Sequence, residues 1–500
     1  MNRAMLRLSL ACLVMFALLL INVTYVQAFK ATSLASGPGN VRIFDEQFQY
    51  KRGSIVVGAT AGGTTGGTTI AESRLGKGGT TYHRYYPFGP VYAPVTGYDS
   101  IYGPSVGGTA GIEEAENKEL AGTDPRLAVH NLIDLVTGKP RLGATVYLTI
   151  SPKAQQAAYN ALKAQGRPAA AVAIDPKTGA ILAMASFPTF NPNRYATLSG
   201  RRLNKIDLAY RKDSQQPLLN RATQATFPPG SSFKVVTGSA AFGTGKVASP
   251  QSTVPAPTNL QLPGTTHVLI NDDNEACGDG HPQLIYAFTI SCNTAFGDLG
   301  MKLGGSVLRA YANKFGFNNP NLTVPLPVTA SVFPRVSNPD FTAFSAIGQF
   351  DDEVTPLQEA MLSATIANDG TLMTPYLVQQ VQAPDLSVVQ SARPSVLSRA
   401  VSSQVASEMK TMMISVTQNP AGTAYATANQ GIAGVEIAGK TGTAQNGVNN
   451  TNLDDAVFTC FAPASNPAIA VGVIVKGGGF GAAAAAPIAV QIIRAYRGIS

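Results

Sequence analysis

The hydrophobic pattern of the chain begins with an uncharged, mostly apolar run from Leu8 to Val26. A transmembrane helix needs about 20 such residues, so this run is long enough to cross a bilayer. Arg3 and Arg7 precede it, and positive charge marks the cytoplasmic flank of a span. We therefore predict a cytoplasmic tail at residues 1–7 and an anchor in the cytoplasmic membrane at residues 8–28, with the remainder outside the cytoplasm.

A cleaved signal peptide is the alternative for this stretch, because Val26-Gln27-Ala28 resembles a cleavage site. The apolar run is longer than the usual signal-peptide core of about 7–15 residues, which favours an uncleaved anchor. Later stretches of the sequence are shorter or carry charges, so we expect a single-pass protein.

Residues 29–155 alternate between short strand patterns and turn-forming stretches. The segment from Arg52 to Val57 predicts a strand, and the Tyr-, Pro- and Gly-rich segment from Tyr82 to Tyr102 predicts short strands and turns. Between them, the Gly/Thr-rich segment from Gly58 to Thr69 has too few apolar side chains to pack a core and is expected to be a loop. The region lacks a grouping of nucleophile, base and acid, so we expect a non-catalytic, β-rich pedestal domain here.

The pattern changes near the strand-like segment from Val146 to Ile150, which precedes a predicted helix from Ser151 to Ala164. The segment from Ala169 to Ser186 predicts two apolar strands joined by the turn-forming Asp175 to Gly179. Helical stretches are predicted at 231–315 and 356–368. Strands are predicted at 432–440, 456–461 and 468–475, and a last helix begins at 487. This order predicts an α+β domain over residues 156–500, an antiparallel sheet with helices on its faces.

The composition allows a large core and argues against some function classes. Hydrophobic residues make up 45% of the 500 residues and charged residues 13%. The net charge of +8 is not gathered into a basic block, so the sequence predicts no nucleic-acid partner, although it suits an anionic membrane or wall polymer. The four histidines show no ligand spacing with the cysteines, so we predict no metal site and no cofactor.

The cysteines suggest one disulfide. Cys277 and Cys292 would close a loop of about 15 residues, and such a bond in an oxidising compartment is worth roughly 3 kcal/mol on the chain-entropy model. Cys12 lies in the anchor, and Cys460 lies in an apolar strand pattern, where a buried free thiol is expected.

The first chemical motif is Ser231-Ser232-Phe233-Lys234, which follows Phe227-Pro228-Pro229-Gly230. The prolines and glycine end any preceding element, and the apolar run after Phe233 predicts a buried helix, so Ser231 lies in or beside its first turn. Residues three apart on a helix are neighbours, which would bring the Lys234 amine to the Ser231 hydroxyl. Lys234 could act as a base only if burial or a nearby cation lowers its pKa.

The S-x-x-K spacing is weak evidence by itself, because it recurs at Ser407 to Lys410. There Val405, Met409 and Met412 recur at helical spacing, which is typical of an ordinary amphipathic helix with the serine and lysine on its polar side.

Two further motifs follow in the chain. Ser291 and Asn293 form an S-x-N motif, although either residue alone could simply cap a helix that starts near Thr294. Lys440-Thr441-Gly442-Thr443 ends a predicted strand, where a solvated lysine is the simpler interpretation. In the order S-x-x-K, S-x-N and K-T-G, the three match the motif set of the penicillin-recognising serine acyltransferases.

The chain resembles the class B penicillin-binding proteins, most closely their short actinobacterial members, along nearly its whole length. Beyond the three motifs, the resemblance rests on Arg52 to Ile55, Asp175 to Gly179, Ile347 to Gln349 and Thr355 to Gln358. It implies a transpeptidase domain of the penicillin-binding/β-lactamase-like fold. The segment at 58–69 looks like an insertion in the pedestal.

The resemblance also implies roles for the motif residues. Ser231 would attack the penultimate D-Ala carbonyl of a D-Ala-D-Ala stem peptide, with Lys234 as general base and Ser291 as proton relay to the leaving group. Asn293 would hold the donor amide. Lys440, with Thr441, Gly442 and Thr443, would bind the terminal carboxylate and the substrate backbone.

The resemblance implies a peptidoglycan D,D-transpeptidase that crosslinks stem peptides, binds β-lactams covalently and works in cell division. A polytopic glycosyltransferase and other wall-synthesis proteins are the expected partners. A D,D-carboxypeptidase is the main alternative; a β-lactam sensor or a non-catalytic scaffold fits the intact motifs and single span less well. The anchor and length argue against a β-lactamase, and residues 29–155 are too few for a glycosyltransferase domain.

Overall fold

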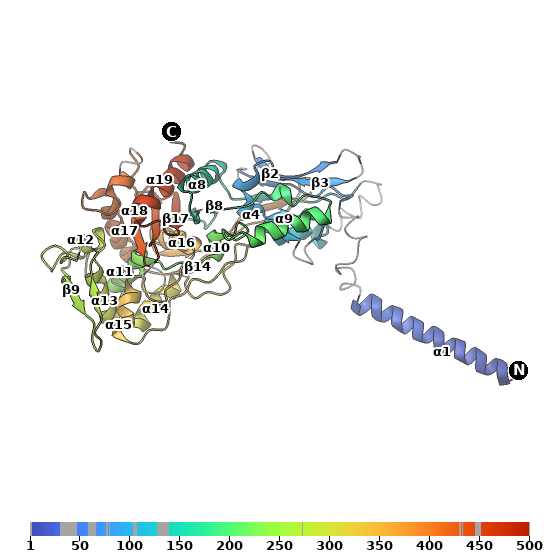
Figure 1. Cartoon of the computed structure of the whole chain (residues 1–500), viewed down its shortest axis with the longest axis horizontal. Helices are drawn as coiled ribbons and strands as arrows, with labels where there is room; N and C mark the ends of the chain where they lie inside the picture. Colours follow the sequence, from blue (N-terminus) through green and yellow to red (C-terminus); the bar gives the residue numbers. More distant parts are fainter. Residues whose placement is uncertain are drawn as a thin grey trace.

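The computed structural model describes residues 3–30, 48–58, 67–76, 79, 81–103, 108–127, 140–272, 274–429, 432, 434–445 and 452–499. The helix α1 (Arg3–Tyr25) continues as a π-helical turn to Lys30 and lies apart from the folded body (Figure 1). Its side chains are almost all exposed, as expected of a helix that a bilayer would cover. The predicted anchor at residues 8–28 falls within this helical stretch.

The part of the molecule that the resemblance predicts to be catalytic, residues 156–500 (the catalytic part), is built on a five-stranded antiparallel sheet, in the order β15-β16-β17-β7-β8. The strands are β7 (Ala169–Ile174), β8 (Ile181–Phe187), β15 (Ala438–Ala444), β16 (Asp455–Ala462) and β17 (Ile469–Val475). The predicted hairpin from Ala169 to Ser186 is confirmed, because β7 pairs with β8 in antiparallel register. Strands buried on both faces read as continuous apolar runs, which explains why the sequence shows them so clearly.

Helices cover both faces of this sheet. Alternate residues of β7 point to opposite sides: Ala171 joins the core that contains α8 (Pro152–Gln165), and Val172 joins the core that contains α16 (Pro356–Ala367). The last helix, α19 (Ala486–Arg497), packs beside α8. The predicted α+β architecture is therefore confirmed.

The second sheet differs from a simple pedestal made of residues 29–155. Its order is β13-β12-β6-β1-β2-β3, so it combines strands of the N-terminal region with β12 (Val378–Gln382) and β13 (Val388–Ser391). Strand β12 pairs with β6 (Thr145–Leu148) across more than 200 positions of sequence. A sequence boundary at 155/156 could not reveal this, because strand pairing between distant segments leaves no local pattern.

The elements of the N-terminal region are short. In order after α1 they are β1 (Ile55–Val57), β2 (Thr68–Leu75), β3 (Tyr82–Tyr85), η2 (Gly89–Val91), α4 (Ala93–Thr96), β4 (Tyr98–Asp99), β5 (Thr109–Ala110), α5 (Ile112–Ala115), α6 (Asn117–Leu120), η4 (Pro125–Leu127) and β6. The expected loop at 58–69 lies mostly outside the described residues, and its last two residues, Thr68 and Thr69, begin β2.

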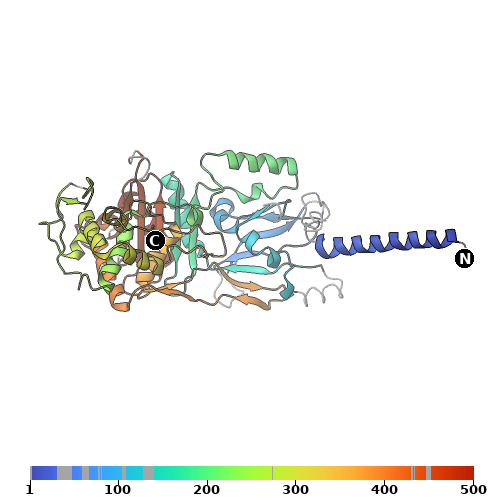
Figure 2. The same ribbon diagram turned by 90° about the horizontal axis from the view of Figure 1, so that it is seen from below.

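A helical arm from the catalytic part lies against the pedestal. The arm contains η5 (Pro192–Arg194) and α9 (Gly200–Lys212), and Figure 2 shows α9 beside the pedestal sheet. Tyr98 stacks on Tyr195, with ring centroids 3.8 Å apart, and Leu203 of α9 is buried in the same cluster. The cluster buries apolar surface between the two parts and so holds them together.

The remaining elements belong to the catalytic part. They are α10 (Arg221–Gln224), η6 (Gly230–Phe233), α11 (Lys234–Gly243), β9 (Asn259–Gln261), β10 (Val268–Ile270), α12 (Leu284–Thr289), α13 (Asn293–Leu303), α14 (Gly305–Lys314), α15 (Pro339–Ala346), β11 (Thr371–Met373), β14 (Val396–Arg399), α17 (Ser403–Gln418), η7 (Tyr425–Asn429) and α18 (Gly481–Ala484). The mainly helical region predicted at 231–315 therefore also contains a small β9–β10 hairpin.

Candidate active site

Ser231 lies in η6, the short 3-10 turn that leads into the buried helix α11. This turn packs against β15: an added Cβ at Gly230 would lie 2.7 Å from the Thr443 carbonyl oxygen, and one at Gly442 would lie 2.7 Å from the Pro229 carbonyl oxygen. The Gly230 N–H also donates to the Gly348 carbonyl at 2.9 Å. The residues just before the S-x-x-K motif are therefore in close backbone contact with the K-T-G strand.

Lys234 makes different contacts from those predicted. Its Nζ donates to the Ser291 carbonyl oxygen at 2.7 Å and to Asn293 Oδ1 at 2.7 Å, and it lies 3.4 Å from Ser291 Oγ. Among the described residues, none forms a hydrogen bond with the Ser231 hydroxyl. The Lys234 amine is instead held by the S-x-N motif.

Lys440 completes a ring of polar contacts around Ser291. Its Nζ donates to Ser291 Oγ at 2.9 Å and to its neighbour's carbonyl, that of Thr441, at 2.9 Å. Ser291 thus contacts both lysines, through its hydroxyl and its carbonyl. The structure brings the three motifs into one hydrogen-bonded cluster.

The backbone of the S-x-N motif is unusual. Ser291 has a φ of +65°, a left-handed conformation that non-glycine residues seldom adopt. This conformation turns the chain between α12 and α13, so that Ser291 and Asn293 face the same lysine. Cys292 lies between them and forms a disulfide with Cys277, with Cα atoms 6.2 Å apart.

Burial lowers the pKa of both lysines, each of which has no exposed surface. Burial and, second, the positive charge of Lys440 lower the pKa of Lys234 well below its ordinary value, while Asp272 opposes the shift. Burial likewise lowers the pKa of Lys440 to about 7, again against Asp272. A lysine with such a pKa can be neutral near physiological pH, which a general base requires.

Two polar residues beside the cluster were not singled out from the sequence. Asn271 Oδ1 accepts hydrogen bonds from the backbone N–H groups of Asn293 and Thr294, at 2.9 and 3.0 Å, and so begins helix α13. Asp272 Oδ1 accepts a hydrogen bond from Asn293 Nδ2 at 2.9 Å. The predicted disulfide could have pointed to Asn271 and Asp272, because it joins Cys277, which follows them closely in the sequence, to Cys292 of the S-x-N motif.

The K-T-G segment lies inside a strand, which corrects the predicted boundaries. We expected a strand over 432–440 that ends at the lysine, but β15 runs from Ala438 to Ala444. Lys440 and Thr443 pair with Thr459 and Ala456 of β16, so the ladder continues past the motif. Gly439 and Gly442 weaken the sequence signal of a strand, whereas the cross-strand hydrogen bonds hold it in place.

The side chains of this strand have partners on neighbouring segments. The Thr441 and Thr423 hydroxyls are 2.6 Å apart, and the Thr443 carbonyl accepts a hydrogen bond from Gln349 Nε2 at 3.4 Å. Gln349 belongs to the Ile347 to Gln349 segment that supported the family resemblance.

A groove of about 650 Å³ opens beside the cluster. Asn293 and Thr443 line it together with Asp272 and Gln349, and Phe350 and Phe480 add apolar wall. It is large enough for a peptide segment, and among the motif residues it gives access to Asn293 and Thr443.

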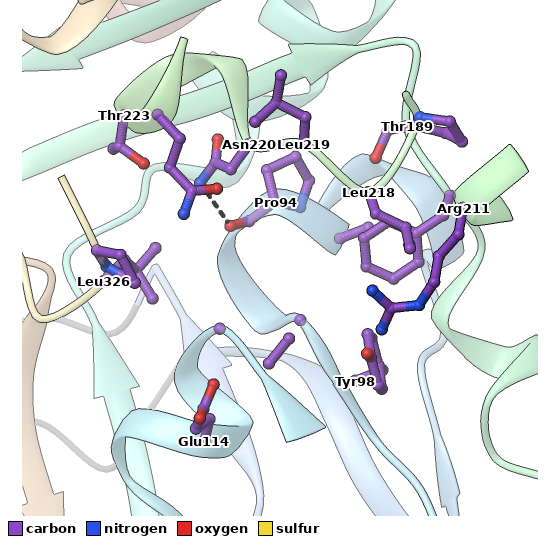
Figure 3. A pocket seen from close by; sticks show the side chains of 18 residues that line it. Pro94, Tyr98, Glu114, Thr189, Arg211, Leu218, Leu219, Asn220, Thr223 and Leu326 are labelled. Atoms are coloured by element: carbon purple, nitrogen blue, oxygen red, sulfur yellow. Dashed lines mark hydrogen bonds between the residues drawn. The ribbon is translucent and has the colours of Figure 1, made fainter. Parts of the chain in front are cut away.

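A separate cavity of about 270 Å³ lies between the pedestal, α9 and the catalytic part. Figure 3 shows Tyr98, Glu114 and Arg211 around it, with Asn220 donating to the Pro94 carbonyl at 3.0 Å. Its lining contains no residue of the three motifs, so this cavity is not the catalytic groove.

The second S-x-x-K sequence is structural, as its pattern indicated. Ser407 is exposed on α17, and Lys410 lies 3.9 Å from Asp369 in an ion pair. Val405 and Met409 are buried on the other face of the helix.

Two family models match the chain. Residues 169–494 match the penicillin binding protein transpeptidase domain, and residues 52–146 match the penicillin binding protein A dimerisation domain. With the motifs assembled on this fold, the chain belongs to the class B penicillin-binding protein transpeptidases. The predicted family and fold are confirmed.

Within this family, the chain is similar along its whole length to named mycobacterial proteins. It is 40% identical to the peptidoglycan D,D-transpeptidase PbpA of Mycolicibacterium smegmatis, over 98% of this chain and 97% of that protein. It is 37% identical to PbpA of Mycobacterium tuberculosis, over 99% of both chains. The ceftriaxone acyl-enzyme complex of M. tuberculosis penicillin-binding protein A matches with a TM-score of 0.84 and 36% identity, over 90% of this chain and 99% of that one.

The helical segment from Met5 to Lys30 contains an 18-residue stretch with a mean hydropathy of 2.3 and is long enough to cross a membrane. Together with the family, this segment indicates a membrane-anchored protein.

Proposed function

We propose that this protein is a peptidoglycan D,D-transpeptidase whose nucleophile is Ser231. The observation that carries the proposal is the contact of both buried lysines, Lys234 and Lys440, with Ser291, beside the turn that presents Ser231. The whole-length similarity to proteins named D,D-transpeptidases supports the same reaction.

In the first step, Ser231 Oγ attacks the carbonyl of the penultimate D-Ala and forms an ester, while the terminal D-Ala leaves with its amine. The Ser231 proton passes to neutral Lys234, which is suited to take it because its pKa is lowered. Ser291 then passes a proton to the departing amine. Its hydroxyl lies 3.4 Å from Lys234 Nζ and 2.9 Å from Lys440 Nζ, so it can relay a proton within the cluster.

The oxyanion of the tetrahedral intermediate needs hydrogen-bond donors at the point where its charge develops. The backbone N–H groups of Ser231, in the first turn of a helix, and of Thr443, on β15, are the proposed donors, each worth about 3 kcal/mol in the barrier. The charged form of Lys440, with Thr441 and Thr443, would bind the terminal carboxylate. Gly442 lets the turn that presents Ser231 lie close against the strand, because a Cβ there would lie 2.7 Å from the Pro229 carbonyl oxygen.

In the second step, the amine of an acceptor stem peptide attacks the Ser231 ester. A new amide forms, the Ser231 hydroxyl is regenerated and the two peptides are crosslinked. A β-lactam would acylate Ser231 in the first step in the same way. Penicillin-binding protein A of M. tuberculosis forms an acyl-enzyme complex with ceftriaxone.

We further propose a single-pass topology, with residues 1–7 in the cytoplasm and the catalytic part outside. The two arginines before the span support this orientation. A role in cell division and the glycosyltransferase partner stay predictions from the resemblance.

Covalent labelling with a fluorescent penicillin tests the nucleophile. The parent protein should be labelled, and Ser231→Ala should not. Ser407→Ala, at the second S-x-x-K, is the matched control and should be labelled normally. Labelling that survives Ser231→Ala, or a parent protein without label, would refute the assignment.

A further inference from the structure

A chain of buried hydrogen bonds lies directly behind η6, the turn that presents Ser231 (the nucleophile turn). Ser232, the residue after the nucleophile, has no exposed surface, and its Oγ lies 2.9 Å from the Pro229 carbonyl oxygen and 2.7 Å from Glu359 Oε1. Glu359 is also fully buried, on helix α16. The chain therefore joins α16 to both sides of the turn that presents Ser231.

The proton count of this chain points to a neutral glutamic acid. A serine hydroxyl has one proton, and a backbone carbonyl has none, so Ser232 can donate to Pro229 or to Glu359 but not to both. If Glu359 carries a proton on Oε1, it donates to Ser232 Oγ, and Ser232 donates to the Pro229 carbonyl. Both contacts are then satisfied. If Glu359 were ionised, one of the two contacts would bring two oxygen atoms together with no proton between them.

We propose that Glu359 is a positioning residue that, as a neutral carboxylic acid, donates a hydrogen bond to Ser232 and thereby fixes the turn that presents Ser231. The inference rests on the proposed role of Ser231 as nucleophile. It assigns Glu359 no contact with the substrate: its effect passes through Ser232 and Pro229.

The packing around Glu359 leaves it little freedom to turn away. Its own carbonyl oxygen accepts a hydrogen bond from the Thr459 hydroxyl of β16. A Cβ added at Gly472 of β17 would lie 2.7 Å from the Glu359 Cβ, so the sheet closes directly over the residue. The Pro229 end of this hydrogen-bond chain is also held in place, because the Pro229 carbonyl packs against Gly442 of the K-T-G strand.

The environment favours the neutral form of this carboxyl. Glu359 Oε2 is buried and without a hydrogen-bond partner in the part of the chain that the structure describes, and a charged oxygen in that position would be strongly disfavoured. Burial raises the pKa of Glu359 to about 8, and the Ser232 hydrogen bond opposes the shift.

The titratable groups on the elements around α16 are engaged elsewhere or neutral. Lys234 and Lys440 bond to the S-x-N motif, Arg221 of α10 donates to the Gln215 carbonyl, and Lys410 of α17 pairs with Asp369. Burial raises the pKa of the Cys460 thiol on β16, so that it stays protonated. Asp455, at the start of β16, accepts a hydrogen bond from the Gly477 N–H, and Glu408 of α17 accepts one from Gln404 Nε2. Strands β7, β11 and β17 and the turn η6 contain no titratable side chains.

The pH dependence of acylation tests the proposal. The rate constant for acylation by a penicillin should fall in the parent protein as Glu359 ionises, by about tenfold for one lost hydrogen bond. Glu359→Gln can donate through its amide at every pH, so this additional alkaline decline should disappear, while changes due to the lysines remain. Glu408→Gln, on the partly exposed side of α17, is the matched control and should behave as the parent. Superimposable profiles of the parent and Glu359→Gln would overturn the proposal.

A second readout does not depend on activity. The infrared spectrum of the parent protein at neutral pH should contain a band of a protonated carboxyl that is absent from Glu359→Gln. Asp352, whose pKa burial also raises, remains in both proteins, so only the difference spectrum counts. A difference spectrum that shows the loss of an ionised carboxylate instead would overturn the proposal. If the parent protein shows the band but is not acylated by penicillin, the proposed function is wrong, whereas the neutral state of Glu359 is still supported.

Ser232→Ala provides an independent variant if Glu359→Gln does not fold. It lacks the acceptor, so acylation should be slower at neutral pH without the additional alkaline decline. A decline equal to that of the parent would contradict a path through Ser232.

Discussion

Lys234 Nζ lies 2.7 Å from Asn293 Oδ1, so the proposed general base and the proposed donor-peptide clamp are hydrogen-bonded to each other. The amide of Asn293 is engaged on both sides, because its Nδ2 donates to Asp272. A donor-peptide carbonyl that accepts a hydrogen bond from Asn293 Nδ2 must therefore replace one of its present acceptors, Asp272 or the Ile270 carbonyl.

Lys234→Arg should abolish most of the acylation activity although it keeps a positive charge. A guanidinium cannot lose its proton in a protein, so the general base is removed. We expect the rate constant for acylation by a penicillin to fall by about 10²–10⁴-fold, the usual contribution of general acid–base catalysis. Stopped-flow or gel-based labelling measures this rate constant.

Lys410→Arg is the control for this substitution, since Lys410 belongs to the second S-x-x-K sequence. Its acylation rate should equal that of the parent protein. Near-normal acylation of Lys234→Arg would show that another group takes the Ser231 proton.

Asp272→Asn should shift the pH profile of the transpeptidase reaction to lower pH. The Asp272 carboxylate raises the pKa of both Lys234 and Lys440, so its removal lowers both. Lys234 must be neutral to act, and the acid limb should therefore begin at lower pH. Lys440 must be charged to bind the substrate carboxylate, so activity is lost on the alkaline side as Lys440 loses its proton, near pH 7 in the free parent protein. In Asp272→Asn this loss of activity should also begin at lower pH.

This shift is measured as kcat/KM against pH with a D-Ala-D-Ala donor peptide. Asp279→Asn changes an exposed carboxylate of the same segment and should leave the profile where it is. A displacement of the Asp272→Asn profile to higher pH would have the wrong sign for this electrostatic account.

Gly348→Ala should disrupt the nucleophile turn. Gly348 has a φ of +75°, and an added Cβ would lie 2.0 Å from the Gly230 carbonyl oxygen, so the two segments would have to separate. We expect acylation to fall by at least about tenfold, since a small misplacement of a reacting group can lower a rate by about 10².

Gly245→Ala isolates the conformational part of this effect. Gly245 has a φ of +72°, but an added Cβ would meet nothing within 4 Å. This variant should lose about 1 kcal/mol of stability and keep the parent acylation rate. Equal acylation rates for the two variants would exclude a role of the Gly348 contact in catalysis.

Breaking the disulfide should destabilise the catalytic part. Cys277 and Cys292 are 15 residues apart, and the chain-entropy model gives about 3 kcal/mol for such a loop. Cys277→Ala should lower the free energy of unfolding in denaturant by about this amount, and the parent protein in reductant should approach the variant. A variant as stable as the oxidised parent would show that the bond contributes nothing.

The sequence predicted those parts of the fold and the site that local patterns encode. The span, the β7–β8 hairpin and the order of the three motifs all appear as continuous runs or fixed spacings. The contact of Lys234 with Asn293 could not be predicted, because it depends on the left-handed backbone of Ser291. Strand β12 in the pedestal sheet and Glu359 behind the nucleophile were equally hidden, since both depend on pairing between distant segments.

The most direct test of the central claim is an incubation of the protein with a D-Ala-D-Ala donor peptide and an acceptor amine, followed by mass spectrometry of the products. The account predicts a donor that has lost its terminal D-Ala and is joined to the acceptor, and no product with Ser231→Ala. A donor that is only hydrolysed would identify a carboxypeptidase instead, and crosslinked product from Ser231→Ala would contradict the proposed mechanism.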